Sequence, residues 1–337
     1  MAYQLKQLPE DFVVTELPAV ETSPQGRYSY FWLTKRGRNT LDAVKELARR
    51  LGVKEKDIGF AGSKDKQAVT KQVISVAGVK KERVEQVDIP NVSVDFLGYG
   101  NKPISLGDLE GNHFEITIRN IEDETIEKTS LVENYFDEQR FSKHNVLIGR
   151  NLVKKDFAQA TSLIDDFKVK RYLEEKPKDY VGALKKLPLR LLRMYVNAYQ
   201  SYLWNKTVAE YLNKKGKVLK IVPYSEGDFI FVTDAERFQD LKIPLLGFGK
   251  SDFEKDVQEI INTILKEEQL AHSDFVIKQI PELSLEGELR NVFVAVKEMR
   301  IGRKTNDELN LGKKKVKISF TLGKGSYATM VVKRMVG

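Results

Sequence analysis

Residues 58–76 read IGFAGSKDKQAVTKQVISV, a glycine-containing loop followed by a run of β-branched residues. The run predicts that the loop enters a strand. Asp65 stands in the loop between Lys64 and Lys66, whose ammonium groups favour an ionised carboxylate. An ionised carboxylate beside a strand can act as a nucleophile or a base. The same residues are also typical of a solvated turn with alternating charge, so both interpretations stand at this point.

The segment before the loop predicts a helix that holds the loop in place. Asn39 can cap this helix and Gly52 can end it. Before it, residues 28–34 predict a strand and residues 35–38 a basic turn. Apolar residues at helical spacing form one face of the helix, namely Leu41, Val44, Leu47 and Leu51.

Three other segments predict strands. Residues 6–16 begin with a proline turn and continue as a β-branched stretch. In residues 103–119, apolar side chains alternate from Phe114 onward, which indicates a strand with one buried face. Residues 313–332 predict two strands joined by a glycine-rich turn. On pattern alone, Phe114 and Phe320 are core residues.

The middle of the chain is expected to be mainly helical. Residues 121–136 show an amphipathic pattern that indicates a helix. Pro188 opens a long helix that Gly216 ends, and its aromatic residues are expected to pack inside the protein. Two further elements are expected, a helix over residues 252–270 and a strand with a turn over residues 290–301.

Composition limits the function classes. The 337 residues carry a net charge of +8, with 41% hydrophobic and 31% charged residues, which indicates a globular protein of about two domains. The positive charge favours an acidic partner, with nucleic acid first and an anionic membrane surface second. No run has the length of a membrane span, and the N-terminus lacks an apolar signal region. We therefore expect a soluble cytoplasmic protein.

The chain offers few groups for metal or nucleotide binding. It has no cysteine and three histidines without metal-ligand spacing, so no metal site is expected. Residues 249–251 read GKS, like the end of a phosphate-binding loop. The first glycine of that motif would fall at position 244, which is Pro244, so a nucleoside triphosphate site is not expected.

Six segments, in the same order along the chain, together resemble the TruD family of tRNA pseudouridine synthases. The segments are KQLPEDFVVTE (6–16), AGSKDKQAVTKQ (61–72), GNHF (111–114), NYFDEQRFS (134–142), NAYQSYLWN (197–205) and FTLGKGSYAT (320–329). Asp137 and Ser142 replace two glycines of the family pattern, and Gly323 replaces a proline. Asp tolerates a left-handed backbone better than Ser does. Arg140 remains in place, as either a phosphate contact or a structural residue.

The resemblance implies an α+β fold with a discontinuous catalytic domain that has a mixed, mostly antiparallel sheet. An α/β domain found only in this family is inserted into it. On this basis we expect the first part of the catalytic domain at residues 1–147, the inserted domain at residues 148–292 and the last part of the catalytic domain at residues 293–337. RNA would lie in the basic cleft between the domains.

The resemblance also implies the reaction, which is isomerisation of a uridine in tRNA to pseudouridine, with uridine 13 as the typical target. Asp65 would be the catalytic aspartate, attacking covalently or abstracting a sugar proton. Phe12, Phe114 and Phe320 would border the extruded base, Asn112 would hydrogen-bond it, and Lys6 would balance the carboxylate. No cofactor is needed, because the isomerisation involves no redox change or net hydrolysis.

Two other functions remain as alternatives. The first is a noncatalytic RNA-binding protein of the same fold, which would have no need of Asp65. The second is a hydrolase with paired carboxylates, for which the sequence offers no clear second acid near Asp65. No exposed heptad or apolar stripe argues for an oligomer, so we expect a monomer.

Overall fold

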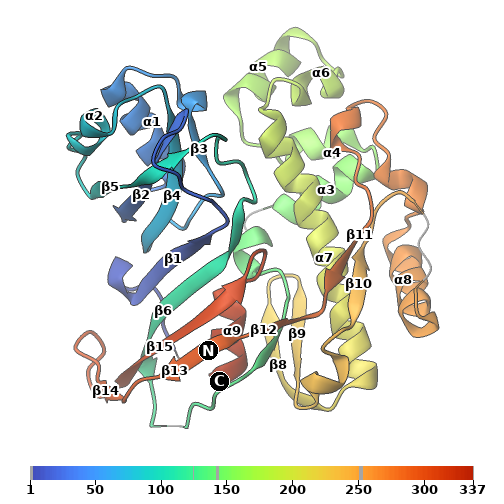
Figure 1. The fold of residues 1–337 in the computed structure, drawn as a ribbon. Helices are drawn as coiled ribbons and strands as arrows, with labels where there is room; N and C mark the ends of the chain where they lie inside the picture. Colours follow the sequence, from blue (N-terminus) through green and yellow to red (C-terminus); the bar gives the residue numbers. More distant parts are fainter. Residues whose placement is uncertain (1–2, 124, 142–143, 250–252, 337) are drawn as a thin grey trace. The chain divides into compact units, whose positions relative to one another are not determined.

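The computed structural model describes residues 3–123, 125–141, 144–249 and 253–336. Contacts between residues divide the chain into unit 1, which is Met1–Ser130 with Ala295–Gly337, and unit 2, which is Leu131–Val294. Unit 1 is therefore discontinuous, and Figure 1 shows its blue-to-green first part and its red last part in one sheet. Residues 131–147, expected in the catalytic domain, lie in unit 2.

Unit 1 is built on a curled, mostly antiparallel sheet (Figure 1). Its strands follow the order β13-β15-β6-β1-β4-β2-β5, with β14 added to β15 and β3 added to β4. The strands are β1 Phe12–Pro18, β2 Tyr28–Arg36, β3 Ile58–Phe60, β4 Val69–Ala77, β5 Val92–Gly100, β6 Leu109–Ile121, β13 Lys297–Ile301, β14 Thr305–Asn306 and β15 Lys314–Gly323. β1 and β4 run parallel, which brings their starting ends together.

Helix α1 (Thr40–Leu51) covers part of one face of this sheet. Val44 and Leu47 of α1 pack in one buried cluster with Phe31 of β2 and Ile74 of β4. Gly52 ends the helix in the left-handed conformation, with φ +69°, as the sequence predicted. Leu41 was expected on the buried face but is exposed, because it lies at the edge of the helix face that Val44, Leu47 and Leu51 bury.

The helix expected at residues 121–136 is wrong. β6 continues to Ile121, and among the described residues that follow only β7 (Leu131–Glu133) is a regular element. β7 pairs with β12 (Phe293–Ala295), and the N–H of Asn134 donates to the carbonyl oxygen of Val292 at 2.7 Å. A partner so distant in sequence supplies the backbone hydrogen bonds, and local periodicity could not reveal it.

The second strand expected near the C-terminus is also wrong. β15 is the first strand, but the residues after the glycine-rich turn form helix α9 (Ala328–Met335). Ala328, Val331 and Val332 are buried at helical spacing. Tertiary packing on this face therefore overrides the β preference of the two valines.

Unit 2 is mainly helical, with short antiparallel strand pairs. Its helices are α3 Asn145–Val153, α4 Phe157–Ser162, α5 Phe167–Glu175, α6 Tyr180–Leu184, α7 Leu189–Lys215 and α8 Lys255–Glu268. β8 (Val218–Tyr224) pairs with β9 (Gly227–Val232), and β10 (Lys242–Leu245) pairs with β11 (Glu288–Asn291). Tyr199 and Trp204 of α7 are fully buried, which confirms for these two that the aromatics pack inside, whereas Tyr202 is partly buried.

The two family glycines that this chain replaces have different outcomes. Asp137 is buried, and it is not among the described residues with positive φ, so its backbone needs no glycine. Ser142 lies outside the described residues, as do Lys250 and Ser251 of the rejected phosphate-loop segment.

Candidate active site

Asp65 and Lys6 meet at one end of the sheet. Lys6 precedes β1 and Asp65 precedes β4, and these parallel strands are in register, with Val13 beside Val69. The Lys6 ammonium lies 2.5 Å from Oδ2 of Asp65, and the two side chains remain 17% and 34% exposed. The ammonium also lies 4.2 Å from the centroid of the Phe12 ring. The carboxylate is thus paired yet reachable from solvent.

Lys35 is a buried lysine that the sequence analysis missed. It was assigned to a basic turn, but β2 extends to Arg36 and Lys35 is 1% exposed. Its Nζ donates to the backbone carbonyl oxygen of Asp65 at 2.6 Å. Burial lowers the pKa of Lys35 to about 8, although the charge of Asp65 raises it. Continuing the alternation of Phe31 and Leu33 by two residues would have placed Lys35 on the inner face.

Glu16, Lys64 and Asn112 form a second polar group on the same face. Glu16 lies directly opposite Asn112 in the β1–β6 register and is buried. Lys64 Nζ lies 2.8 Å from Glu16 Oε2 and donates to Asn112 Oδ1 at 2.7 Å. The other Glu16 oxygen accepts the N–H of Val73 at 3.1 Å. The Asn112 carbonyl is therefore engaged, and its Nδ2 amino group is the end left to donate.

The three phenylalanines lie next to one another on one face of the sheet. Phe114 stands opposite Phe320 on β15, and Phe12 stands opposite Ile116, the next inward residue of β6. The ring centroids are 6.2 Å apart for Phe12 and Phe114, and 5.6 Å apart for Phe114 and Phe320. All three rings are buried. A base could stack on them only after neighbouring side chains move.

Thr40 and Gln72 fasten the Asp65 loop to the sheet. Thr40 begins α1, and its hydroxyl accepts the N–H of Lys64 at 3.0 Å. The same hydroxyl donates to Gln72 Oε1 at 3.1 Å, and Gln72 Nε2 donates to the Gly62 carbonyl oxygen at 2.9 Å. The loop is held on both sides of Ser63, which restricts the position of Asp65.

The structure brings the sequence-predicted residues together within unit 1. Lys6 contacts both Asp65 and Phe12, and the rings of Phe12, Phe114 and Phe320 lie next to one another. Asn112 is reached through Lys64. Arg140 belongs to unit 2, where its guanidinium lies 4.9 Å from the centroid of the Phe136 ring. This contact is a cation–π interaction.

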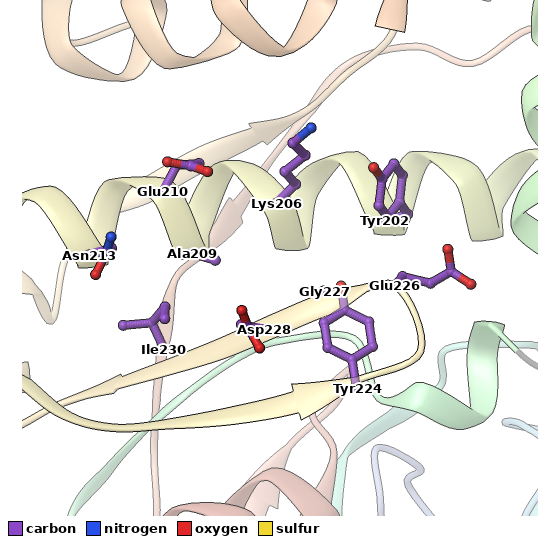
Figure 2. Close-up of a pocket in the computed structure, with 10 residues that line it drawn as sticks. All are labelled: Tyr202, Lys206, Ala209, Glu210, Asn213, Tyr224, Glu226, Gly227, Asp228 and Ile230. Carbon is purple, nitrogen blue, oxygen red and sulfur yellow. The ribbon is translucent and has the colours of Figure 1, made fainter. Parts of the chain in front are cut away.

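A separate cavity of about 290 Å³ lies in unit 2 between α7 and the β8–β9 hairpin (Figure 2). Its lining includes Tyr202 and Glu210 of α7, and Tyr224, Glu226 and Asp228 at the hairpin. Burial raises the pKa of Glu226. None of the sequence-predicted site residues lines this cavity.

Within residues 3–123, 125–141, 144–249 and 253–336, no group of three or more histidine or acidic side chains could hold a metal ion. In those same ranges no helix combines the length and the apolar character needed to cross a bilayer.

Comparisons with known proteins agree along nearly the whole chain. The family model described as tRNA pseudouridine synthase D (TruD) matches residues 1–168 and 162–335. The tRNA pseudouridine synthase D of Aquifex aeolicus is 30% identical, over 99% of this chain and 98% of its own length. A relative of the same family name in Methanosarcina acetivorans is 32% identical, over 98% of this chain and 91% of its own length. A crystal structure of the TruD protein from Methanosarcina mazei matches with a TM-score of 0.70 and 28% identity, covering 99% of this chain and 93% of that one.

Proposed function

The chain belongs to the tRNA pseudouridine synthase D (TruD) family, and from this premise we propose that it isomerises uridine 13 of tRNA to pseudouridine at Asp65. One observation carries the choice of Asp65, which is its position at the end of the parallel strands β1 and β4. There it pairs with Lys6 beside the Phe12 ring and remains partly exposed. A carboxylate in such a position can reach the sugar or the base of a bound nucleotide.

The reaction breaks the bond between N1 of uracil and C1′ of the sugar and forms a new bond from C5 to C1′. A proton leaves C5 and N1 gains one, so atoms balance without a redox partner. In the proposed mechanism Asp65 attacks the sugar or removes a sugar proton. The Lys6 ammonium, 2.5 Å from Oδ2, would hold the carboxylate in position for either route.

The neighbouring residues would hold the extruded base. Phe12, Phe114 and Phe320 would offer ring faces after the side-chain movement described above, as flipped bases commonly stack on aromatics. Asn112 would donate from Nδ2 to a uracil carbonyl, because Lys64 already engages its oxygen. Glu16 has both oxygens engaged, by Lys64 and by the Val73 N–H, which argues against a paired-carboxylate hydrolase.

We extend the proposal to the whole protein. Unit 1 would be the catalytic domain, unit 2 the inserted family-specific domain, and tRNA the partner, in accord with a net charge of +8. The protein would act as a monomer in the cytoplasm. Light scattering of the purified chain tests the monomer directly.

The deciding experiment measures tritium release from C5 of labelled uridine in a tRNA transcript. Asp65→Asn should lower turnover at least about a hundredfold, because the amide can neither attack nor accept a proton. Asp42→Asn is the matched control. Asp42 is an exposed aspartate in the first turn of α1, and its variant should retain wild-type turnover. The modified position is then mapped in the product.

Each outcome has a clear meaning. Release by the wild type and by Asp42→Asn but not by Asp65→Asn supports the proposal, and mapping to position 13 supports the target. Wild-type turnover in Asp65→Asn would rule out the catalytic aspartate. If no variant releases tritium from tRNA while all of them bind it, the noncatalytic RNA-binding function replaces the synthase.

A further inference from the structure

Lys6 has a backbone conformation that its sequence does not favour. Its φ is +59°, in the left-handed region that non-glycine residues seldom adopt. Residues held in such conformations persist only when their surroundings impose them, and they gather at functional sites. In this conformation the Lys6 ammonium reaches Asp65 Oδ2 and the Phe12 ring. The residues that impose it are therefore part of how the pair is built.

Arg119, on β6, holds the chain on both sides of Lys6. On one side, its backbone pairs with Gln4: the Gln4 N–H donates to the Arg119 carbonyl oxygen at 2.8 Å, and the Arg119 N–H donates back at 3.0 Å. On the other side, its Nε lies 2.9 and 3.0 Å from the two oxygens of Asp11. Asp11 also accepts the Leu8 N–H at 2.9 Å. The segment of residues 4–11, which contains Lys6, is therefore bound to Arg119 at both of its ends.

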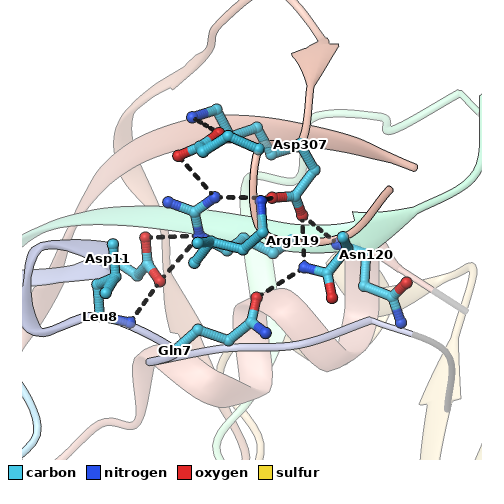
Figure 3. A network of polar contacts seen from close by, with 10 residues as sticks. Gln7, Leu8, Asp11, Arg119, Asn120 and Asp307 are labelled. Atoms are coloured by element: carbon cyan, nitrogen blue, oxygen red, sulfur yellow. Dashed lines mark hydrogen bonds and ion pairs between the residues drawn. The ribbon is translucent and has the colours of Figure 1, made fainter. Parts of the chain in front are cut away.

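Two other carboxylates hold the guanidinium of Arg119 in place, in addition to Asp11; Figure 3 shows this network. Arg119 Nη1 lies 2.8 Å from Asp307 Oδ1 and 3.1 Å from Glu308 Oε1. Burial raises the pKa of Asp307, but hydrogen bonds from the Asn120 N–H, Asn310 and Arg119 outweigh it and bring that pKa to about 2. Asn310 also donates to Gln7 Oε1 at 2.8 Å, next to Lys6. Arg119 is nearly fully buried and cannot reach a substrate by itself.

We propose that Arg119 is a positioning residue that holds Lys6 against Asp65 through Gln4 and Asp11. The inference rests on the proposed function, since Lys6 matters only if Asp65 acts. Its consequence is that a buried arginine, with no contact to RNA, sets the turnover of the site. The competing interpretation is that Arg119 only joins β6 to residues 305–313 and serves stability.

The test compares two carboxylates on the same guanidinium. Asp11→Asn keeps an oxygen that accepts the Leu8 N–H, but it replaces the ion pair between Asp11 and Arg119 by a weaker neutral contact. Arg119 keeps its contacts with Asp307 and Glu308 in this variant. Glu308→Gln weakens a different contact of the same guanidinium, the ion pair between Arg119 and Glu308, which does not hold residues 4–11. In steady-state tritium release, Asp11→Asn should lower kcat about tenfold with KM nearly unchanged, and Glu308→Gln should change kcat less than about twofold. Thermal unfolding of each variant reports its fold.

A Lys6→Met background separates positioning from stability. If Arg119 acts through Lys6, Asp11→Asn should add less than about a twofold loss in that background, because the group to be positioned is gone. A tenfold loss of kcat from Asp11→Asn in the Lys6→Met background would overturn the inference. So would a loss of kcat in Glu308→Gln as large as that in Asp11→Asn. If Asp11→Asn does not fold, Arg119→Lys takes its place, since it keeps the charge but loses the two-oxygen contact.

The failure of the proposed function remains distinguishable. Wild-type turnover in Asp65→Asn would overturn the function of the site as a whole. An inactive Asp65→Asn together with full kcat in Lys6→Met would overturn the positioning inference and the role of Lys6, but it would leave Asp65 as the catalytic residue.

Discussion

At the residue scale, Lys35 places an ammonium group inside unit 1, next to the backbone of Asp65. Burial lowers its pKa to about 8, whereas a lysine in an unfolded chain titrates near ~10.4. Between these two pH values the unfolded chain binds more protons at this residue than the folded protein does. The stability that Lys35 contributes therefore rises with pH across this window.

The variant Lys35→Met tests this sign. From about pH 7 to about pH 10, the free energy of unfolding of the wild type should rise relative to that of Lys35→Met, as measured by urea denaturation at each pH. Lys45→Met is the control, because Lys45 is exposed on α1, and its difference from the wild type should stay constant. If the difference in unfolding free energy between the wild type and Lys35→Met also stayed constant with pH, the lowered pKa of the buried Lys35 would be contradicted.

Asn112 offers a prediction about base recognition. Asn112→Asp keeps an oxygen for Lys64 but loses the Nδ2 donor. If Nδ2 donates to a uracil carbonyl, kcat/KM for tritium release should fall by about tenfold to a hundredfold, the usual cost of an unmade hydrogen bond.

Asn306→Asp is the matched control for Asn112→Asp. The Asn306 side chain also accepts a hydrogen bond from a lysine, from Lys314 Nζ at 2.8 Å, but Asn306 is exposed. It pairs with Lys314 at the first residue of β15, whereas Phe320 lies near the other end of that strand. The new charge there should leave kcat/KM within about twofold. An equal fall in both variants would mean that charge, and not the lost donor, weakens RNA binding.

At the element scale, the start of α1 and the loop before β4 are joined by the Thr40 hydroxyl. Thr40→Val keeps the shape of the side chain but leaves the Lys64 N–H and Gln72 Oε1 without their shared partner. We expect a loss of about 1–3 kcal/mol in unfolding free energy and a lower kcat, since the loop gains freedom around Asp65. Urea unfolding and tritium release measure the two effects.

Thr70→Val provides the comparison for Thr40→Val. Thr70 is fully buried on β4, and among the described residues its hydroxyl has no hydrogen-bond partner. Removing an unsatisfied hydroxyl should leave stability unchanged or raise it slightly. If both substitutions cost the same, the Thr40 contacts contribute nothing beyond the packing of a buried threonine.

At the scale of the whole molecule, the chain leaves unit 1 after Ser130 and re-enters it at Ala295, and these two points are close together. The Val296 N–H donates to the Ser130 carbonyl oxygen at 2.8 Å, so the two ends of the discontinuous unit are neighbours. Replacing residues 131–294 by a short glycine–serine linker should therefore leave unit 1 folded, with a cooperative thermal transition by circular dichroism.

A cavity variant shows whether the shortened protein is truly packed. Leu47 of α1 is fully buried against the sheet, so Leu47→Ala should destabilise the shortened chain by about 2–5 kcal/mol. A transition that is broad, or indifferent to Leu47→Ala, would indicate a molten state and contradict an independently folding unit.

Elements with local signals can be predicted from the amino-acid sequence alone. Gly52 ends α1 as expected, and the alternation from Phe114 to Ile118 marked β6. Asn39 stands at the start of α1, but its side chain makes no capping hydrogen bond and its Nδ2 donates to Asp42 instead. The TruD resemblance, which the family model and the relatives confirm, located Lys6, Asp65 and the three phenylalanines before any geometry was known. Their roles in catalysis stay predictions.

The tertiary structure decided what depends on partners far away in the chain. Residues 121–136 look helical locally, but among the described residues of this range distant backbone pairing forms the end of β6 and β7 instead. Valines after residue 328 favour a strand, but packing makes them α9. Lys35, Glu16 and Arg119 look like surface charges in sequence, because only the assembled sheet supplies Asp65, Lys64 and Asp11 as their partners. The energy of a buried charge is set by such partners, and no local pattern encodes them.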